Sequence, residues 1–209
     1  MIDFVIFEDS QHPDFTAVID IYQEAFPASE RIPIPLVKTR INNADYQLFV
    51  GYQKSQVVFM AILCNIADTK FVLLAYIATQ ERFRNQKIGS KFFNYILPRL
   101  KQEEKYLLLE VENPQYGENP QLRNRRLNFY RRMGAQQLKD VRFAIPPLEG
   151  SLPVEMLLMI APHFPEQVLS GKIVKKIITW LFVEGYRGSP HSILLAELIK
   201  TIEPIVELI

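Results

Sequence analysis

Two cations and a glycine lie close together after a long apolar run. The apolar run is Phe71–Thr79, and Arg84, Lys87 and Gly89 follow it. A glycine lets a ligand approach the backbone. The first turn of a helix has unpaired N–H groups at the positive end of the helix dipole. If a helix begins near Gly89, this segment forms an anion site that suits a pyrophosphate.

Two carboxylates lie on a second apolar run, Tyr106–Glu112. Alternation along a strand places Glu110 and Glu112 on one face. Partial burial and the like charges would raise the pKa of one carboxyl, which then becomes a usable general base. We prefer Glu112, because it lies nearer the end of the strand. The alternative is that both carboxylates lie on a solvated face.

A helix of residues 124–133 would carry an aromatic hydroxyl. Leu127, Phe129, Tyr130 and Met133 give it an apolar face, and arginines occupy the rest. Gly134 fits the position just past a helix end, which needs a positive φ. The phenol of Tyr130 is therefore either a catalytic group or an ordinary core side chain.

Apolar periodicity and turn residues predict the remaining elements. Pro98 is expected to kink or end the helix that follows Gly89. The predicted strands are residues 3–7, 46–52, 56–65, 71–79, 106–112, 137–145 and 154–160, with a loop at 146–153. The predicted helices are residues 14–26, 35–41, 89–101 and 124–133.

These motifs together resemble the GCN5-related N-acetyltransferase (GNAT) superfamily. The segment 84–90 is similar to its acetyl-CoA motif, [Q/R]-x-x-G-x-[G/A], although Lys87 replaces the first glycine. Residues 124–134 are similar to its Asn-x-x-x-x-x-Tyr-x-x-x-Gly pattern. The resemblance covers residues 14–160. It implies an α/β (α+β mixed) fold, in which a twisted mixed β-sheet has helices on both faces, for a GNAT-like domain of residues 1–162.

The resemblance also implies a cofactor and site residues. Acetyl-CoA (coenzyme A) would be bound by a strand end, the basic loop and the second motif. Tyr130 would be the general acid, and the segment around Phe26, Glu30 and Arg31 would bind the acceptor; helix-end solvation and a surface ion pair are the alternative for that segment. The implied cofactor-binding residues are Ile77, Ala78, Thr79, Arg84, Asn85, Gln86, Lys87, Ile88, Gly89, Ser90, Asn124 and Tyr130.

The function implied is that of an acyltransferase. An acetyl-CoA-dependent N-acetyltransferase would transfer an acetyl group to a primary amine of a small molecule by direct attack. Two alternatives stay open. One is a catalytically weak acyl-CoA-binding sensor or assembly module, which Lys87 at a glycine position and the long C-terminal helical segment favour. The other is a protein lysine or N-terminal acetyltransferase.

Residues 163–209 are predicted to form a C-terminal helical extension packed on the core. Helices are expected at 166–170, 172–184 and 192–207, with Ile173, Ile177, Trp180 and Leu181 on one stripe. The alternatives for this extension are a wall of the acceptor site or a contact in a homodimer.

Composition narrows the class of protein further. The chain has 209 residues, 48% of them hydrophobic, and a net charge of +1, which argues against broad nucleic-acid binding. The single cysteine, Cys64, cannot form an internal disulfide. The three histidines are scattered, so no metal site is expected. No apolar run approaches a membrane span, and the N-terminus does not resemble a signal peptide, so a cytoplasmic location is expected.

Overall fold

The structure is a computed structural model that describes residues 1–146 and 153–209. Of the predicted loop 146–153, residues 147–152 lie outside the described part. The described chain forms two compact units. Unit 1 comprises Met1–Asn65 and Val72–Glu103, and unit 2 comprises Ile66–Phe71 and Glu104–Ile209.

Four antiparallel strands form the sheet of unit 1. Their order is β1 (Asp3–Phe7), β2 (Tyr46–Gln53), β3 (Gln56–Asn65) and β4 (Phe71–Thr79). Lys54 and Ser55 have φ values of 48° and 61°, which make the two-residue turn of the predicted β2–β3 hairpin. Tyr76 pairs with Ile62 but Leu74 with Leu63, so β4 has a bulge at Ala75.

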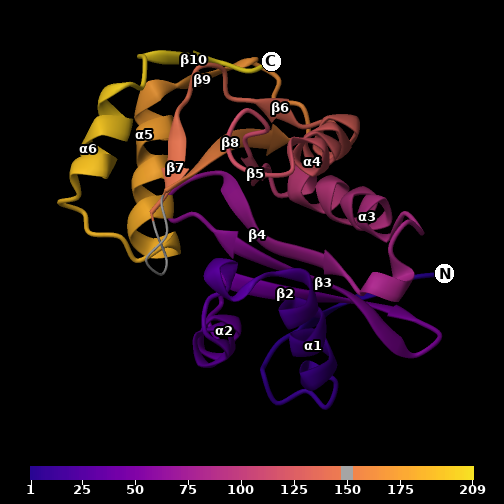
Figure 1. Cartoon of the computed structure of the whole chain (residues 1–209). Helices are drawn as coiled ribbons and strands as arrows, with labels where there is room; N and C mark the ends of the chain where they lie inside the picture. Colours follow the sequence, from indigo (N-terminus) through magenta and orange to yellow (C-terminus); the bar gives the residue numbers. More distant parts are fainter. Residues whose placement is uncertain (147–152) are drawn as a thin grey trace. The chain divides into compact units, whose positions relative to one another are not determined.

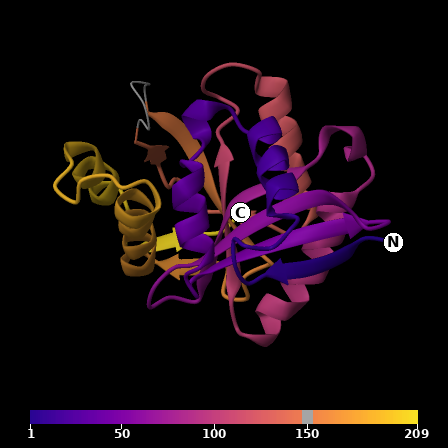
Figure 2. The same ribbon diagram turned by 90° about the horizontal axis from the view of Figure 1, so that it is seen from below.

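Helices cover both faces of this sheet. Figures 1 and 2 show α1 (Phe15–Ala25) and α2 (Ile34–Ile41) on one face and α3 (Ile88–Gln102) on the other. The ring of Phe92 on α3 packs against Phe49 and Phe59, at centroid distances of 5.4 and 4.9 Å. Short 3₁₀ turns occur at Ala28–Glu30 and Glu81–Phe83. Pro98 lies inside α3, which continues to Gln102, so it does not end the helix.

Unit 2 is organised around β8 (Val154–Ala161). β5 (Tyr106–Glu112), β6 (Gln136–Gln137) and β7 (Phe143–Ile145) each pair with it antiparallel. The single strand predicted for 137–145 is wrong, because two short strands pair with opposite ends of β8. α4 (Pro120–Arg132) packs near β5. Gly134 follows its C-cap residue, Met133, and its φ of 84° confirms the predicted helix stop.

The C-terminal segment is only partly helical. Its helices are α5 (Gly171–Trp180), a π-helical turn Leu181–Gly185, and α6 (Ile193–Lys200). β9 (Val168–Ser170) pairs antiparallel with β10 (Ile205–Glu207), so the helices predicted over 166–170 and up to 207 are wrong. A Cβ at Gly171 would lie 1.9 Å from the carbonyl oxygen of Glu203, so a glycine is needed there.

The apolar stripe of α5 is shifted from its predicted position. Val174, Ile177 and Leu181 are buried, whereas Ile173 is 38% exposed. The segment belongs to the same compact unit as β5, α4 and β8. The boundary between the two units does not fall near residue 162. The assignment of 163–209 as a separate extension stays a prediction.

The mixed α/β fold class predicted from the sequence is confirmed. The paired strands within each unit are antiparallel, and helices pack beside them. Among the described residues, no helix combines the length and the apolar character needed to cross a membrane.

Candidate functional site

The predicted anion site is the loop between β4 and α3. The first hydrogen bond of α3 runs from the N–H of Lys91 to the carbonyl oxygen of Lys87, at 3.0 Å. The N–H groups of Ile88, Gly89 and Ser90 precede it, so they have no partner within the helix. Together with the helix dipole, these groups favour an anion at this end of α3.

Lys87 adopts the backbone conformation that its position requires. Its φ and ψ are 60° and 22°, in the left-handed region where glycine is usual. Asn85, two residues earlier, also has a positive φ, 64°. The loop therefore makes its turn into α3 without the first glycine of the motif, at the cost of a conformation that lysine seldom adopts.

Arg84 is held by contacts within unit 1. Its Nε donates to the carbonyl oxygen of Thr79 at 3.3 Å, and its Nη2 lies 3.4 Å from Glu24 Oε1. The same carboxylate oxygen accepts a 2.5 Å hydrogen bond from the N–H of Glu81. The Arg84 side chain is still 45% exposed, so it can contact an anion. Glu24 thus connects the end of α1 to the loop, a role that the sequence did not reveal.

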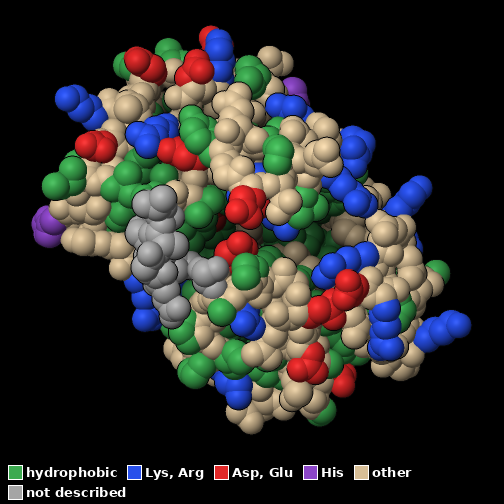
Figure 3. All heavy atoms as spheres, viewed as in Figure 1, with side chains coloured by type: hydrophobic (Ala, Val, Ile, Leu, Met, Phe, Trp, Pro, Cys, Tyr) green, Lys and Arg blue, Asp and Glu red, His purple; other side chains and the backbone are tan. Residues whose placement is uncertain are grey.

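Acidic and basic side chains both occur across the face drawn in Figure 3. In the loop itself, Arg84 and Lys87 are cations, and the neighbouring Gln86 is exposed and uncharged. The positive side chains at the start of α3 are therefore those of the loop itself, Arg84 and Lys87.

The strand before the loop is fixed by β3. Ile77, Ala78 and Thr79 pair with Ala61, Met60 and Phe59. In an antiparallel strand, successive backbone groups alternate between the two sides, so only half of those in this segment are used by β3. A role of these three residues in binding the cofactor stays a prediction.

Tyr76 organises the segment predicted to bind the acceptor. Its hydroxyl donates to the carbonyl oxygen of Glu30 at 3.1 Å and accepts from the N–H of Ile32 at 3.3 Å. Its ring contacts Phe26, with centroids 5.0 Å apart. Phe26, Glu30 and Arg31 therefore lie on a segment that β4 holds in place. A tyrosine on an apolar strand carried no sequence signal for this role.

The two carboxylates of β5 lie in different surroundings. Glu112 forms ion pairs with Arg123, at 3.2 Å, and with Arg126, both on α4. Arg123 also donates to the carbonyl oxygens of Asn113 and Tyr116. Glu112 is thus engaged in holding α4 and the following loop. These contacts do not favour it as the base, in contrast to the preference drawn from its position on the strand.

Glu110 is more buried and has fewer partners for its charge. Its Oε2 accepts a hydrogen bond from the hydroxyl of Tyr186 at 3.0 Å. Its Oε1 is buried and has no hydrogen-bond partner among the described residues. Burial raises the pKa of Glu110 from 4.5 to about 7, although the bond from Tyr186 lowers it. A buried acceptor without a partner costs about 1–3 kcal/mol, so its presence needs an explanation.

Tyr130 and Asn124 both lie on α4. Burial raises the pKa of the Tyr130 hydroxyl to about 12, and the charge of Arg126 lowers it in part. The phenol therefore stays protonated near neutral pH. Asn124 is exposed, and its Nδ2 donates to the carbonyl oxygen of Pro120 at 2.9 Å, within its own helix. This contact gives no support to a role for Asn124 in binding the cofactor.

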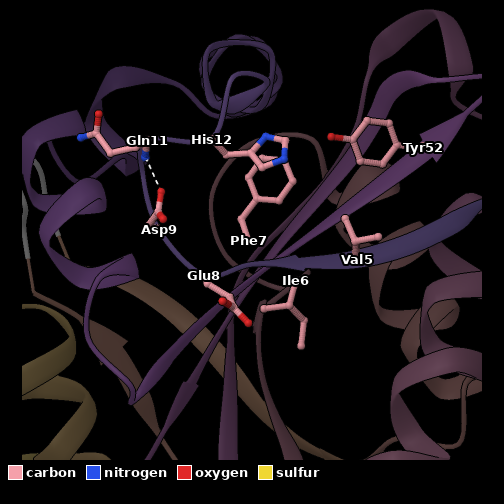
Figure 4. A pocket seen from close by; sticks show the side chains of 8 residues that line it. All are labelled: Val5, Ile6, Phe7, Glu8, Asp9, Gln11, His12 and Tyr52. Atoms are coloured by element: carbon pink, nitrogen blue, oxygen red, sulfur yellow. Dashed lines mark hydrogen bonds between the residues drawn. The ribbon is translucent and has the colours of Figure 1, made fainter.

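A hollow of about 570 Å³ lies beside β1. Phe7 and His12 stack in it with ring centroids 3.8 Å apart, and Gln11 bonds Asp9 through its N–H at 2.7 Å (Figure 4). Its lining contains none of the predicted site residues. The hollow is lined by Val5, Ile6, Phe7, Glu8, Asp9, Gln11, His12 and Tyr52.

Comparison with known proteins identifies the fold. No family model and no curated protein matches this chain. A structure from Bacteroides thetaiotaomicron, assigned to the GNAT family of acetyltransferases, is 20% identical over 90% of this chain and 99% of that one, with a TM-score of 0.73.

Two enzymes of known substrate are also similar. The ribosomal-protein-S18-alanine N-acetyltransferase from Escherichia coli is 20% identical over 78% of this chain and 94% of that one, with a TM-score of 0.58. An aminoglycoside 6'-N-acetyltransferase complexed with coenzyme A is 13% identical over 78% of this chain and 98% of that one, also with a TM-score of 0.58. The fold of this chain is the GNAT fold.

Proposed function

We propose that this protein is an acetyl-CoA-dependent N-acetyltransferase that acts on a primary amine of a small molecule by direct attack. One observation carries the proposal. On a GNAT fold, the chain between β4 and α3 turns through a left-handed Lys87 and leaves the first N–H groups of α3 without helical partners. A basic loop of this form suits the pyrophosphate of coenzyme A.

The residues of the loop fit that group. The N–H groups of Ile88, Gly89 and Ser90 would donate to phosphate oxygens, and Arg84 and Lys87 would add positive charge. When bound, acetyl-CoA supplies the acetyl group as a thioester. The backbone of Ile77–Thr79 that is not used by β3 would pair with its pantetheine arm, as the sequence resemblance implies.

Glu110 is the residue we assign as general base. An amine must lose a proton before it can attack, and a base with a pKa near the working pH is the most effective. Burial gives Glu110 a pKa of about 7, and its Oε1 has no hydrogen-bond partner among the described residues. Glu112 is assigned a structural role, because Arg123 and Arg126 hold its carboxylate.

Tyr130 is the residue we assign as general acid. Its hydroxyl keeps its proton at neutral pH, since burial raises its pKa to about 12. It would give that proton to the departing sulfur. The raised pKa makes this phenol a weaker acid than an ordinary tyrosine, so the proton would move as the carbon–sulfur bond breaks and charge develops on sulfur.

The acceptor would meet the segment around Phe26, Glu30 and Arg31. Tyr76 holds this segment through Glu30 and Ile32, which supports a defined binding surface there. The fold alone does not choose the acceptor, because it occurs in an enzyme for an aminoglycoside and in one for a ribosomal protein. A small amine is our proposal, and protein acetylation is the alternative to test beside it.

A binding-only module has less support than the sequence suggested. That alternative depended on Lys87 in place of a glycine and on the long C-terminal helical segment. Because Lys87 adopts the left-handed conformation, the loop keeps its turn. Glu110 and Tyr130 also have environments suited to proton transfer.

The test combines binding and turnover. Titration calorimetry with acetyl-CoA should show binding to the wild type and at least a tenfold loss, about 1.4 kcal/mol, in Gly89→Val, because the branched side chain blocks the approach of phosphate. Asn94→Val, an exposed position on the same helix, is the control and should bind normally.

Thiol release with a panel of small amines and peptides then tests transfer. Turnover with a small amine is the expected result. Unchanged affinity in Gly89→Val would remove the loop as the cofactor site. Binding without release of thiol on any amine or peptide would favour the binding-only module.

A further inference from the structure

Tyr186 follows an irregular turn in the C-terminal segment. The π-helical turn Leu181–Gly185 ends α5, and the N–H of Tyr186 donates to the carbonyl oxygen of Leu181 at 2.9 Å. Leu181 and Phe182 are buried, with 0% and 2% of their surface exposed. A π-turn inserts one extra residue, so the chain leaves the helix in a different direction. Such turns are frequent at functional sites.

The chain beyond Tyr186 is fixed as well. The N–H of Gly188 donates to the carbonyl oxygen of Phe182 at 2.8 Å. A Cβ at Gly188 would lie 2.4 Å from the Phe182 ring, so only glycine allows the chain to pass this closely. Tyr186 is therefore held between two anchored points, which limits where its side chain can go.

The hydroxyl of Tyr186 contacts one oxygen of the Glu110 carboxylate. It donates to Oε2 at 3.0 Å, across 76 residues of sequence. Oε1 is buried and has no hydrogen-bond partner in the described ranges 1–146 and 153–209. Leu158, which is apolar, is the neighbour of Glu110 on β8, and the nearby Glu112 is occupied by Arg123 and Arg126. Tyr186 thus orients a carboxylate that has few other polar contacts.

We propose that Tyr186 is a positioning residue for the general base: it holds Oε2 of Glu110 so that Oε1 takes the proton of the acceptor amine. The inference rests on the proposed function. In the step, one proton moves from the ammonium nitrogen to Oε1 and leaves the lone pair on nitrogen. The C-terminal segment would then be part of the catalytic apparatus.

A hydroxyl that donates to a carboxylate also favours its ionised form. Tyr186 therefore opposes the effect of burial and keeps Glu110 ionised at a lower pH than burial alone would allow. A tyrosine that served only to attach the C-terminal segment would contribute to stability. It would have no reason to change the pH dependence of turnover.

The experiment compares Tyr186→Phe with the wild type in the full chain. The substitution keeps the ring and removes the donor. We expect the acid limb of the kcat/KM profile to move up by about one pH unit or more. At pH 7, kcat/KM should fall about fivefold or more, while the affinity for acetyl-CoA from calorimetry stays the same. Tyr116→Phe, at a 52% exposed tyrosine of the same unit, is the matched control and should leave the profile in place.

A double-mutant comparison shows whether Tyr186 acts through Glu110. In a Glu110→Gln background, Tyr186→Phe should have no further effect on turnover. A ¹³C NMR titration of the Glu110 carboxyl gives a second readout that does not depend on activity. Its midpoint should rise in Tyr186→Phe.

Three results would overturn the inference. The first is an active wild type with an unmoved acid limb and an unmoved carboxyl midpoint in Tyr186→Phe. The second is an equal loss of turnover in the Glu110→Gln background, which would mean a structural attachment. The third is a wild type that releases no thiol with any amine or peptide; that result is known before any variant is compared, and it rejects the proposed function itself.

Discussion

Glu110→Gln should make the protein more stable at neutral and alkaline pH while it removes the proposed base. The pKa of Glu110 is about 7 in the folded state and 4.5 ordinarily, so the folded state binds more protons between these pH values. The contribution of Glu110 to stability is therefore fully present below about pH 4.5 and is lost as the pH rises toward 7. The difference between the two pKa values corresponds to about 3 kcal/mol. Glutamine keeps the shape of the side chain and does not ionise, so the variant avoids this loss.

Urea unfolding at pH 5 and pH 8 measures the effect. Near pH 5 the two proteins should have nearly equal free energies of unfolding, and at pH 8 the variant should be more stable by about 2–3 kcal/mol. For a chain of this size that corresponds to roughly 5–10 °C in Tm. Turnover of the variant should fall by about 10² or more.

Glu112→Gln is the control, because it changes the same side chain two residues away. It breaks the ion pairs with Arg123 and Arg126, so it should lower stability by about 1 kcal/mol at both pH values. If the difference between Glu110→Gln and the wild type is the same at pH 5 and pH 8, Glu110 does not titrate near neutrality. The argument that it is the base would then be refuted.

Two further substitutions test the acid and the loop. Tyr130→Phe keeps the ring and removes the proton donor, so kcat should fall by about 10²–10⁴ while the affinity for acetyl-CoA stays within about twofold. An unchanged kcat in stopped-flow thiol release would mean that Tyr130 serves only in packing. Lys87→Gly removes the strain of a left-handed lysine but makes the unfolded chain more flexible. These two effects oppose each other, so the free energy of unfolding should change by less than about 1 kcal/mol. The same variant should bind acetyl-CoA about 3–10 times more weakly at low salt, with a difference that shrinks as salt rises; a salt-independent difference in calorimetry would mean that Lys87 shapes the loop without contributing its charge.

Much of the core fold could be predicted, because its signals are local. The apolar runs Gln56–Asn65, Phe71–Thr79 and Tyr106–Glu112 are strands with the predicted bounds. Gly134 was predicted to follow a helix end and has a φ of 84°. Each of these features depends on a continuous run of residue types or on one residue with special backbone freedom, so neighbouring residues suffice to predict it.

The C-terminal segment shows what local signals leave out. Val168–Ser170 was predicted to be helical but pairs with Ile205–Glu207, which lies more than 30 residues later. Three-residue strands have almost no periodicity of their own, so their conformation depends on the partner. The apolar positions in Gly171–Trp180 fitted a helix, yet the side of the helix that is buried depends on the surrounding packing.

The preference between the two carboxylates also depends on groups that local signals leave out. Strand alternation placed Glu110 and Glu112 on one face, and position along the strand then favoured Glu112. The deciding groups come from distant segments: Arg123 and Arg126 hold Glu112, and Tyr186 contacts Glu110. The sequence identified both carboxylates as candidates, but it did not show which of the two would have its charge neutralised by an ion pair.

The contrast between these two residues also supports the functional reading. A carboxylate that serves structure is expected to have partners for its charge, and Glu112 has two. Glu110 has one neutral donor and a buried oxygen with no partner among the described residues, which costs stability at neutral pH. An apolar or amide side chain at that position would avoid the cost. Perturbed groups of this kind occur most often where chemistry requires them, so the instability expected of Glu110 is itself an argument that it is the base.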